Sequence, residues 1–64
     1  MYKIRFLTGD PLPTPNLFKS PAHAETAIFA MLGRPGVVAE RKNDRRVPRQ
    51  YLHEGILVAE VLLA

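Results

Sequence analysis

The segment SPAHAETAIFAMLG, residues 20–33, carries the strongest local signal in the sequence because it contains both ends of a helix. Ser20 is a residue type that caps helix N-termini, Pro21 suits the first helical position, and Gly33 suits a left-handed stop. Between these ends one apolar stripe recurs at helical spacing, formed by Ala24, Ala27, Ile28, Met31 and Leu32. The segment therefore predicts an amphipathic helix of about three turns.

Three segments around this helix have the composition of strands. Residues 2–8, YKIRFLT, alternate apolar and basic side chains, which is typical of a half-buried strand. Residues 37–42, VVAERK, predict a second strand directly after the helix. Residues 56–64, ILVAEVLLA, are apolar on both faces and fit a central strand. A C-terminal helix is the alternative there, because periodicity does not decide the structure of a short apolar run.

Two further segments are less regular. Residues 9–16, GDPLPTPN, space three prolines two positions apart, which predicts a rigid connecting loop and gives no P-x-x-P ligand motif. Residues 47–52, VPRQYL, can form a strand, and Pro48 restricts that strand to a sheet edge. Asn43 and Asp44 can form a tight turn before it.

Together these segments predict an α+β fold in which one helix packs on a three- or four-stranded antiparallel sheet. The chain order is strand–helix–strand–strand, with a fifth element, one more strand, as the alternative. Residues 1–64 are expected to form a single domain with a thin margin of stability. The outer apolar face of the last strand needs cover, so a homodimer through residues 56–63 is one expectation.

Composition and motifs argue against several chemistries. The chain has no cysteine, which excludes disulfides, thiolate metal sites and a cysteine nucleophile. His23 and Glu25 match only half of a zinc deaminase signature, and His23 and His53 are too few for a three-ligand zinc site. No phosphate-binding or catalytic-triad motif occurs. We therefore predict no catalytic residue, no metal and no cofactor.

The apolar run at the C-terminus bears on localisation. It is nine residues long and contains Glu60, whereas a transmembrane helix needs about 20 apolar residues. The opening MYKIRFL also lacks the apolar core of a signal peptide. We expect a cytoplasmic protein without membrane association.

The segment ERKNDRRVPRQ, residues 40–50, holds five of the nine Lys and Arg residues. Its five cations outweigh Glu40 and Asp44 by three, and the charges elsewhere cancel, so this segment carries the whole net charge of +3. Arginine forms bidentate contacts with carboxylates and phosphates. The candidate partner-binding residues are these cations and two aromatic residues that offer contact area: Arg41, Lys42, Arg45, Arg46, Arg49, Tyr51 and Phe29.

Three functions can use this segment. The first is a non-enzymatic module that binds an acidic surface of a target protein. The second is a sequence-tolerant nucleic-acid binder, in which Tyr51 would stack on a base. The remote third is a metal-free ribonuclease toxin in which arginine holds the phosphate and Tyr51 or His53 transfers protons. Acidic residues interrupt the basic run and no second basic patch extends it, which argues against nucleic acid and also fits a solvated hairpin that keeps the protein soluble. Of the three functions we expect the first.

In size, lack of cysteine and order of elements, the chain resembles the small inhibitors that phages and mobile elements encode, such as anti-CRISPR proteins. The resemblance is carried by MYKIRFL as an opening strand, SPAHAETAIFAMLG as the helix and a strand-rich remainder ending at ILVAEVLLA. It spans the whole chain without a diagnostic motif and carries over no functional residue. It implies an inhibitor that covers a site on host machinery, and the basic charge favours an acidic protein target over DNA mimicry.

Overall fold

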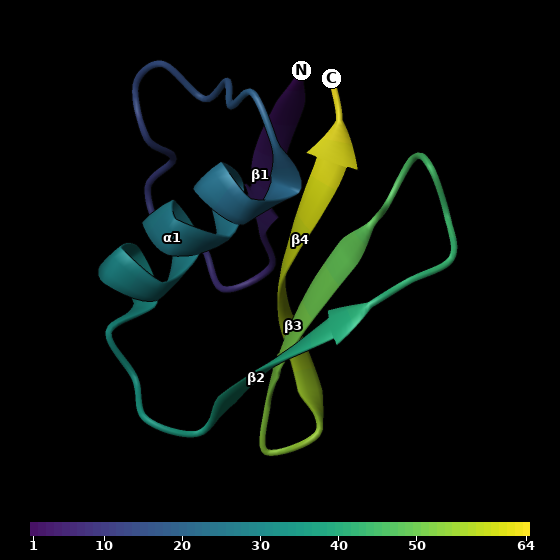
Figure 1. Ribbon diagram of the computed structural model, residues 1–64. Coiled ribbons are helices and arrows are strands. Elements are labelled where there is room, and N and C mark those ends of the chain that lie inside the picture. Colours follow the sequence, from purple (N-terminus) through teal and green to yellow (C-terminus); the bar gives the residue numbers. More distant parts are fainter.

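The computed structural model describes residues 1–64, which form one helix and one four-stranded antiparallel sheet (Figure 1). The elements follow along the chain as β1 (Tyr2–Phe6), α1 (Pro21–Leu32), β2 (Val37–Arg41), β3 (Arg49–His53) and β4 (Ile56–Leu63). Within the sheet the strand order is β1-β4-β3-β2. The predicted α+β class is therefore confirmed. The predicted chain order strand–helix–strand–strand is one strand short of the structure, whereas the alternative with one more strand matches it.

The helix α1 begins and ends as its sequence predicts. Ser20 Oγ accepts a hydrogen bond of 3.2 Å from the His23 backbone N–H. Gly33 adopts a left-handed φ of 55°, and its N–H donates to the Phe29 carbonyl. The centre of the apolar stripe is buried, whereas Met31 at its margin stays exposed. This margin is free because α1 packs on β1 and β4, on one side of the sheet only (Figure 1).

The C-terminal apolar segment is a strand, and β4 lies in the middle of the sheet between β1 and β3. This position agrees with its apolar composition and decides against the C-terminal helix. A bulge opposite Tyr51 and Leu52 leaves Val58 without a register partner on β3, and Val58 joins the buried core. That core lies between α1 and the sheet and consists of Ile4, Ala24, Ile28, Leu32, Tyr51, Val58, Ala59 and Val61.

The expected edge position of the strand after Pro48 is wrong. The strand β3 begins at Arg49 and lies inside the sheet, between β4 and β2. Pro48 precedes the strand, so its missing N–H removes no ladder hydrogen bond. Its carbonyl instead accepts a hydrogen bond of 2.8 Å from the Lys42 N–H.

The proline loop between β1 and α1 covers the outer edge of β1. Phe18 and Tyr2 exchange two backbone hydrogen bonds of 2.8 Å. The Asn16 side chain acts as the next strand residue would, because its Oδ1 accepts from the Ile4 N–H and its Nδ2 donates to the Ile4 carbonyl, both at 2.9 Å. A side-chain amide thus satisfies an edge that would otherwise invite pairing with another chain.

Replacing Asn16 by alanine should lower the free energy of unfolding by about 1–2 kcal/mol, because two hydrogen bonds to a strand edge are lost. Urea unfolding followed by far-UV circular dichroism measures this change. Asn43→Ala is the matched control, since Asn43 is exposed in a loop and makes no side-chain hydrogen bond. Equal stability of the two variants would contradict the role assigned to Asn16.

Candidate functional site

The basic segment 40–50 runs from the end of β2 through a loop into the start of β3. The Lys42–Pro48 backbone hydrogen bond closes this loop, which is wider than the tight turn predicted at Asn43 and Asp44. Asp44 Oδ1 accepts from the Arg46 N–H at 2.9 Å, as in an Asx turn. The Arg46 carbonyl accepts from the Leu63 N–H at 2.8 Å, which holds the loop beside the end of β4.

Carboxylates neutralise two of the five cations in this segment. Arg49 Nη1 lies 3.4 Å from Glu25 Oε2 on α1, and the Arg49 side chain is only 16% exposed. Lys42 Nζ lies 3.0 Å from Glu40 Oε1, with both side chains exposed. The other three cations, Arg41, Arg45 and Arg46, are exposed and form no ion pair. We call these three residues, of which Arg41 ends β2 and the other two lie in the loop that follows, the basic loop.

Tyr51 lies in the core and not on the surface. Its side chain is fully buried, and its hydroxyl donates a hydrogen bond of 3.0 Å to Glu25 Oε1. Phe29 meets the Tyr51 ring edge-on, with centroids 5.7 Å apart, and is itself exposed at its outer side. Because α1 covers this face of β3, the prediction that Tyr51 contacts a partner is corrected, whereas Phe29 keeps surface for contact.

The surroundings of Tyr51 also change its acid–base behaviour. Burial raises the pKa of the Tyr51 phenol well above its ordinary value, and the hydrogen bond and negative charge of Glu25 raise this pKa further. The phenol is therefore a protonated donor at neutral pH. A general acid or base works best with a pKa near the working pH, so this environment gives no support to Tyr51 as a proton carrier in a ribonuclease.

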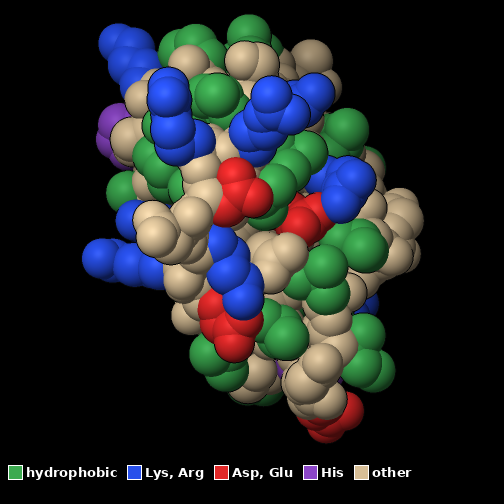
Figure 2. Space-filling view, turned by 90° about the vertical axis from the view of Figure 1, so that its right-hand side faces the viewer, with side chains coloured by type: hydrophobic (Ala, Val, Ile, Leu, Met, Phe, Trp, Pro, Cys, Tyr) green, Lys and Arg blue, Asp and Glu red, His purple; other side chains and the backbone are tan.

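The open face of the sheet, on the side away from α1, carries a polar row across all four strands. The row consists of register partners on neighbouring strands: Arg5, Glu60, Gln50 and Glu40. Glu60 pairs with Arg5 through Oε1, and its Oε2 accepts from Gln50 Nε2 at 2.7 Å. These neighbours leave Glu60 only 4% exposed. Figure 2 shows acidic side chains set among basic ones on this side of the molecule.

Sequence reasoning missed this polar row. The signal was present, because Glu60 is the one charged residue in an otherwise apolar strand. A buried carboxylate needs partners, and the alternation of β1 supplies Arg5 on the face opposite Ile4. The row also covers part of the outer face of β4, although the homodimer through residues 56–63 stays a prediction.

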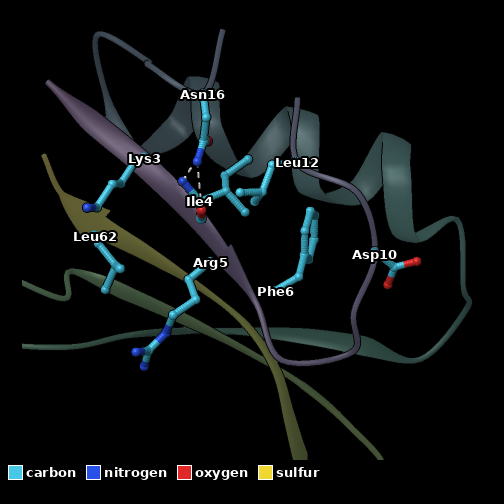
Figure 3. Close-up of a pocket in the computed structure, with 8 residues that line it drawn as sticks. All are labelled: Lys3, Ile4, Arg5, Phe6, Asp10, Leu12, Asn16 and Leu62. Carbon is cyan, nitrogen blue, oxygen red and sulfur yellow. Dashed lines mark hydrogen bonds between the residues drawn. The ribbon is translucent and has the colours of Figure 1, made fainter. Parts of the chain in front are cut away.

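A cavity of about 400 Å³ lies between β1 and the proline loop (Figure 3). Residues 3–6, Leu62 and three loop residues line it, and Asn16 reaches across to the Ile4 backbone. Most of its polar groups already have partners inside the chain: Asn16 binds Ile4, Arg5 binds Glu60, and Asp10 accepts from Thr8. The cavity therefore gathers few free groups for chemistry.

No three His, Asp or Glu side chains are grouped as metal ligands. No helix has both the length and the apolar character needed to cross a bilayer.

The chain matches no protein-family model, no curated protein and no solved structure. The fold and its surface define a small α+β protein with one concentration of unpaired basic charge.

Proposed function

We propose that this protein is a small non-enzymatic binding module that engages an acidic surface of another protein, as an inhibitor or regulator would. The observation that supports it is the basic loop: Arg41, Arg45 and Arg46 are exposed and have no carboxylate partner. The carboxylates of Glu25 and Glu40 are already engaged by Arg49 and Lys42. The guanidinium groups of the basic loop are therefore available to carboxylates of a partner, with which arginine forms bidentate pairs.

An acidic protein surface suits this loop better than nucleic acid does. The aromatic side chain nearest to the cations in sequence, Tyr51, is buried and offers no face for a base. Glu40 and Asp44 interrupt the basic run, so the segment offers no continuous row of cations along which a phosphate backbone could lie. Nucleic-acid binding through the same cations is the alternative function.

Charge reversal in the double variant Arg45→Glu, Arg46→Glu should weaken partner binding by about tenfold or more, because two attractive contacts become repulsive. The test is capture from a nuclease-treated bacterial lysate, followed by mass spectrometry and an affinity measurement on the captured protein. Lys3→Glu, Lys19→Glu is the matched control, with the same change in net charge at exposed sites outside the basic loop.

The proposal expects one protein in stoichiometric amount that survives nuclease and is lost with the double variant alone. Recovery of nucleic acid only, or of proteins that nuclease treatment removes, would overturn it in favour of the alternative. In that case affinity should fall by about two orders of magnitude from 50 to 200 mM salt, as expected for three to four phosphate contacts.

A further inference from the structure

The two edges of the sheet differ in whether their outward backbone groups have hydrogen-bond partners. On β1, the outward backbone groups of Tyr2 and Ile4 are bonded by Phe18 and Asn16. The strand β2 forms the opposite edge, and no element of the chain pairs with its outer side (Figure 1). An uncovered edge of this kind is a template for another strand.

The hydrogen-bond pattern identifies the free groups on β2. The Lys42 N–H points to β3, where it meets the Pro48 carbonyl. Because backbone direction alternates along an antiparallel strand, Val38 and Glu40 also bond toward β3. Val37, Ala39 and Arg41 therefore point their N–H and C=O groups outward, and none of these groups has a hydrogen-bond partner.

The flanks of β2 are accessible as well. Val38 is 59% exposed, and Ala39 and Arg41 are exposed on the other face because α1 packs on β1 and β4. The strand contains no proline, and its pairing with β3 has no bulge. The devices that usually block an edge are thus absent from β2, apart from its charged side chains.

We propose that the β2 edge accepts an extended acidic segment of a partner protein as a fifth, antiparallel strand. This proposal rests on the proposed function and specifies what the partner presents. Main-chain hydrogen bonds would form at Val37, Ala39 and Arg41. The basic loop lies at the C-terminal end of β2, so in antiparallel pairing the acidic residues lie at the N-terminal end of the added strand and apolar residues lie opposite Val37.

Charge favours this occupant over a second copy of the chain. Each copy would bring its own segment 40–50, which carries the entire net charge of +3. The antiparallel register that pairs all of β2 with itself sets Val37 opposite Arg41 and Val38 opposite Glu40, so charged side chains face apolar ones. An acidic segment would instead place opposite charge beside Arg41 and the loop that follows.

The test selects peptides from a displayed library of random dodecapeptides against the folded protein, then measures their affinity for the variants. Ala39→Pro removes one outward N–H without removing a bond to β3, and proline is tolerated at this position of an edge strand. We expect enriched peptides to be acidic in their N-terminal half and to bind Ala39→Pro at least about tenfold more weakly. Ala39→Val, which keeps the N–H, should retain binding, and circular dichroism confirms that both variants fold.

Three results would overturn the inference: no enrichment of acidic peptides, equal affinity for Ala39→Pro, or a wild-type dimer in sedimentation that Ala39→Pro dissociates. The last would assign the edge to a second copy. The proposed function fails separately, when a captured protein is indifferent to Arg45→Glu, Arg46→Glu. A captured protein that is lost with this double variant but kept by Ala39→Pro would retain the function and overturn strand addition.

Discussion

Replacing Tyr51 by alanine is expected to remove a large part of the stability of the fold. Tyr51 is the largest of the fully buried side chains, and removing so large a buried ring costs about 3–5 kcal/mol. A domain of this length has a total stability of roughly 3–10 kcal/mol, so the loss takes a third or more of it. Far-UV circular dichroism and urea unfolding measure the folded fraction and the change in free energy.

The Tyr51 ring contributes strongly to stability because it connects α1 to β3. Its hydroxyl binds Glu25, Arg49 pairs with the same carboxylate, and Phe29 packs edge-on against the ring. Tyr51→Phe is the matched control: it keeps the ring and removes only the hydrogen bond to a charged group, at a cost of about 1.5–3 kcal/mol. A Tyr51→Ala variant no less stable than Tyr51→Phe would show that the ring is not central to the core.

Tyr51→Phe gives a second result when its stability at alkaline pH is compared with that of the wild-type protein. In the folded protein burial raises the pKa of Tyr51, whereas in the unfolded chain this pKa is about 10. The contribution of Tyr51 is thus complete below pH 10 and is lost as pH rises from 10 toward the folded pKa, because only the unfolded chain releases the proton. Wild-type stability should decline there more steeply than that of Tyr51→Phe.

The features predicted correctly from sequence are those encoded locally. Ser20, Pro21 and Gly33 bound α1 because a cap needs only residues within one turn of the helix end. The apolar run of β4 likewise indicates a central strand from its own composition. The edge position predicted from Pro48 was wrong for a related reason. A shift of one residue decides whether Pro48 lies inside a strand or just before it, and local propensity does not resolve that position.

The candidate site was harder to predict because it depends on which face of β3 meets the helix. Arg49 and Tyr51 share one face of the strand and Gln50 and Leu52 share the other, and both faces mix polar with apolar side chains. The choice follows from pairing with β4 and from Glu25 on α1, which are distant in sequence. Exposure of Arg45 and Arg46 was predictable, since they lie in a loop, whereas the inward position of Arg49 was not.

Replacing Glu60 by alanine should lower the free energy of unfolding by about 2–3 kcal/mol, because both carboxylate oxygens have partners and the group is 4% exposed. Urea unfolding of Glu60→Ala and Glu40→Ala measures the contrast. Glu40 makes an exposed ion pair with Lys42, so its removal should cost less than about 1 kcal/mol. Similar losses for the two variants would contradict the central role of Glu60.

Glu60→Leu separates the stability of the polar row from its effect on solubility. Replacing a buried ionic group with an apolar one of similar volume is often close to neutral, so Glu60→Leu should be more stable than Glu60→Ala. It also joins Leu52, Val38 and Leu62 into a larger apolar surface on the open face. Self-association in sedimentation should therefore rise more in Glu60→Leu than in Glu60→Ala, because leucine places a large apolar side chain where the natural chain has a carboxylate.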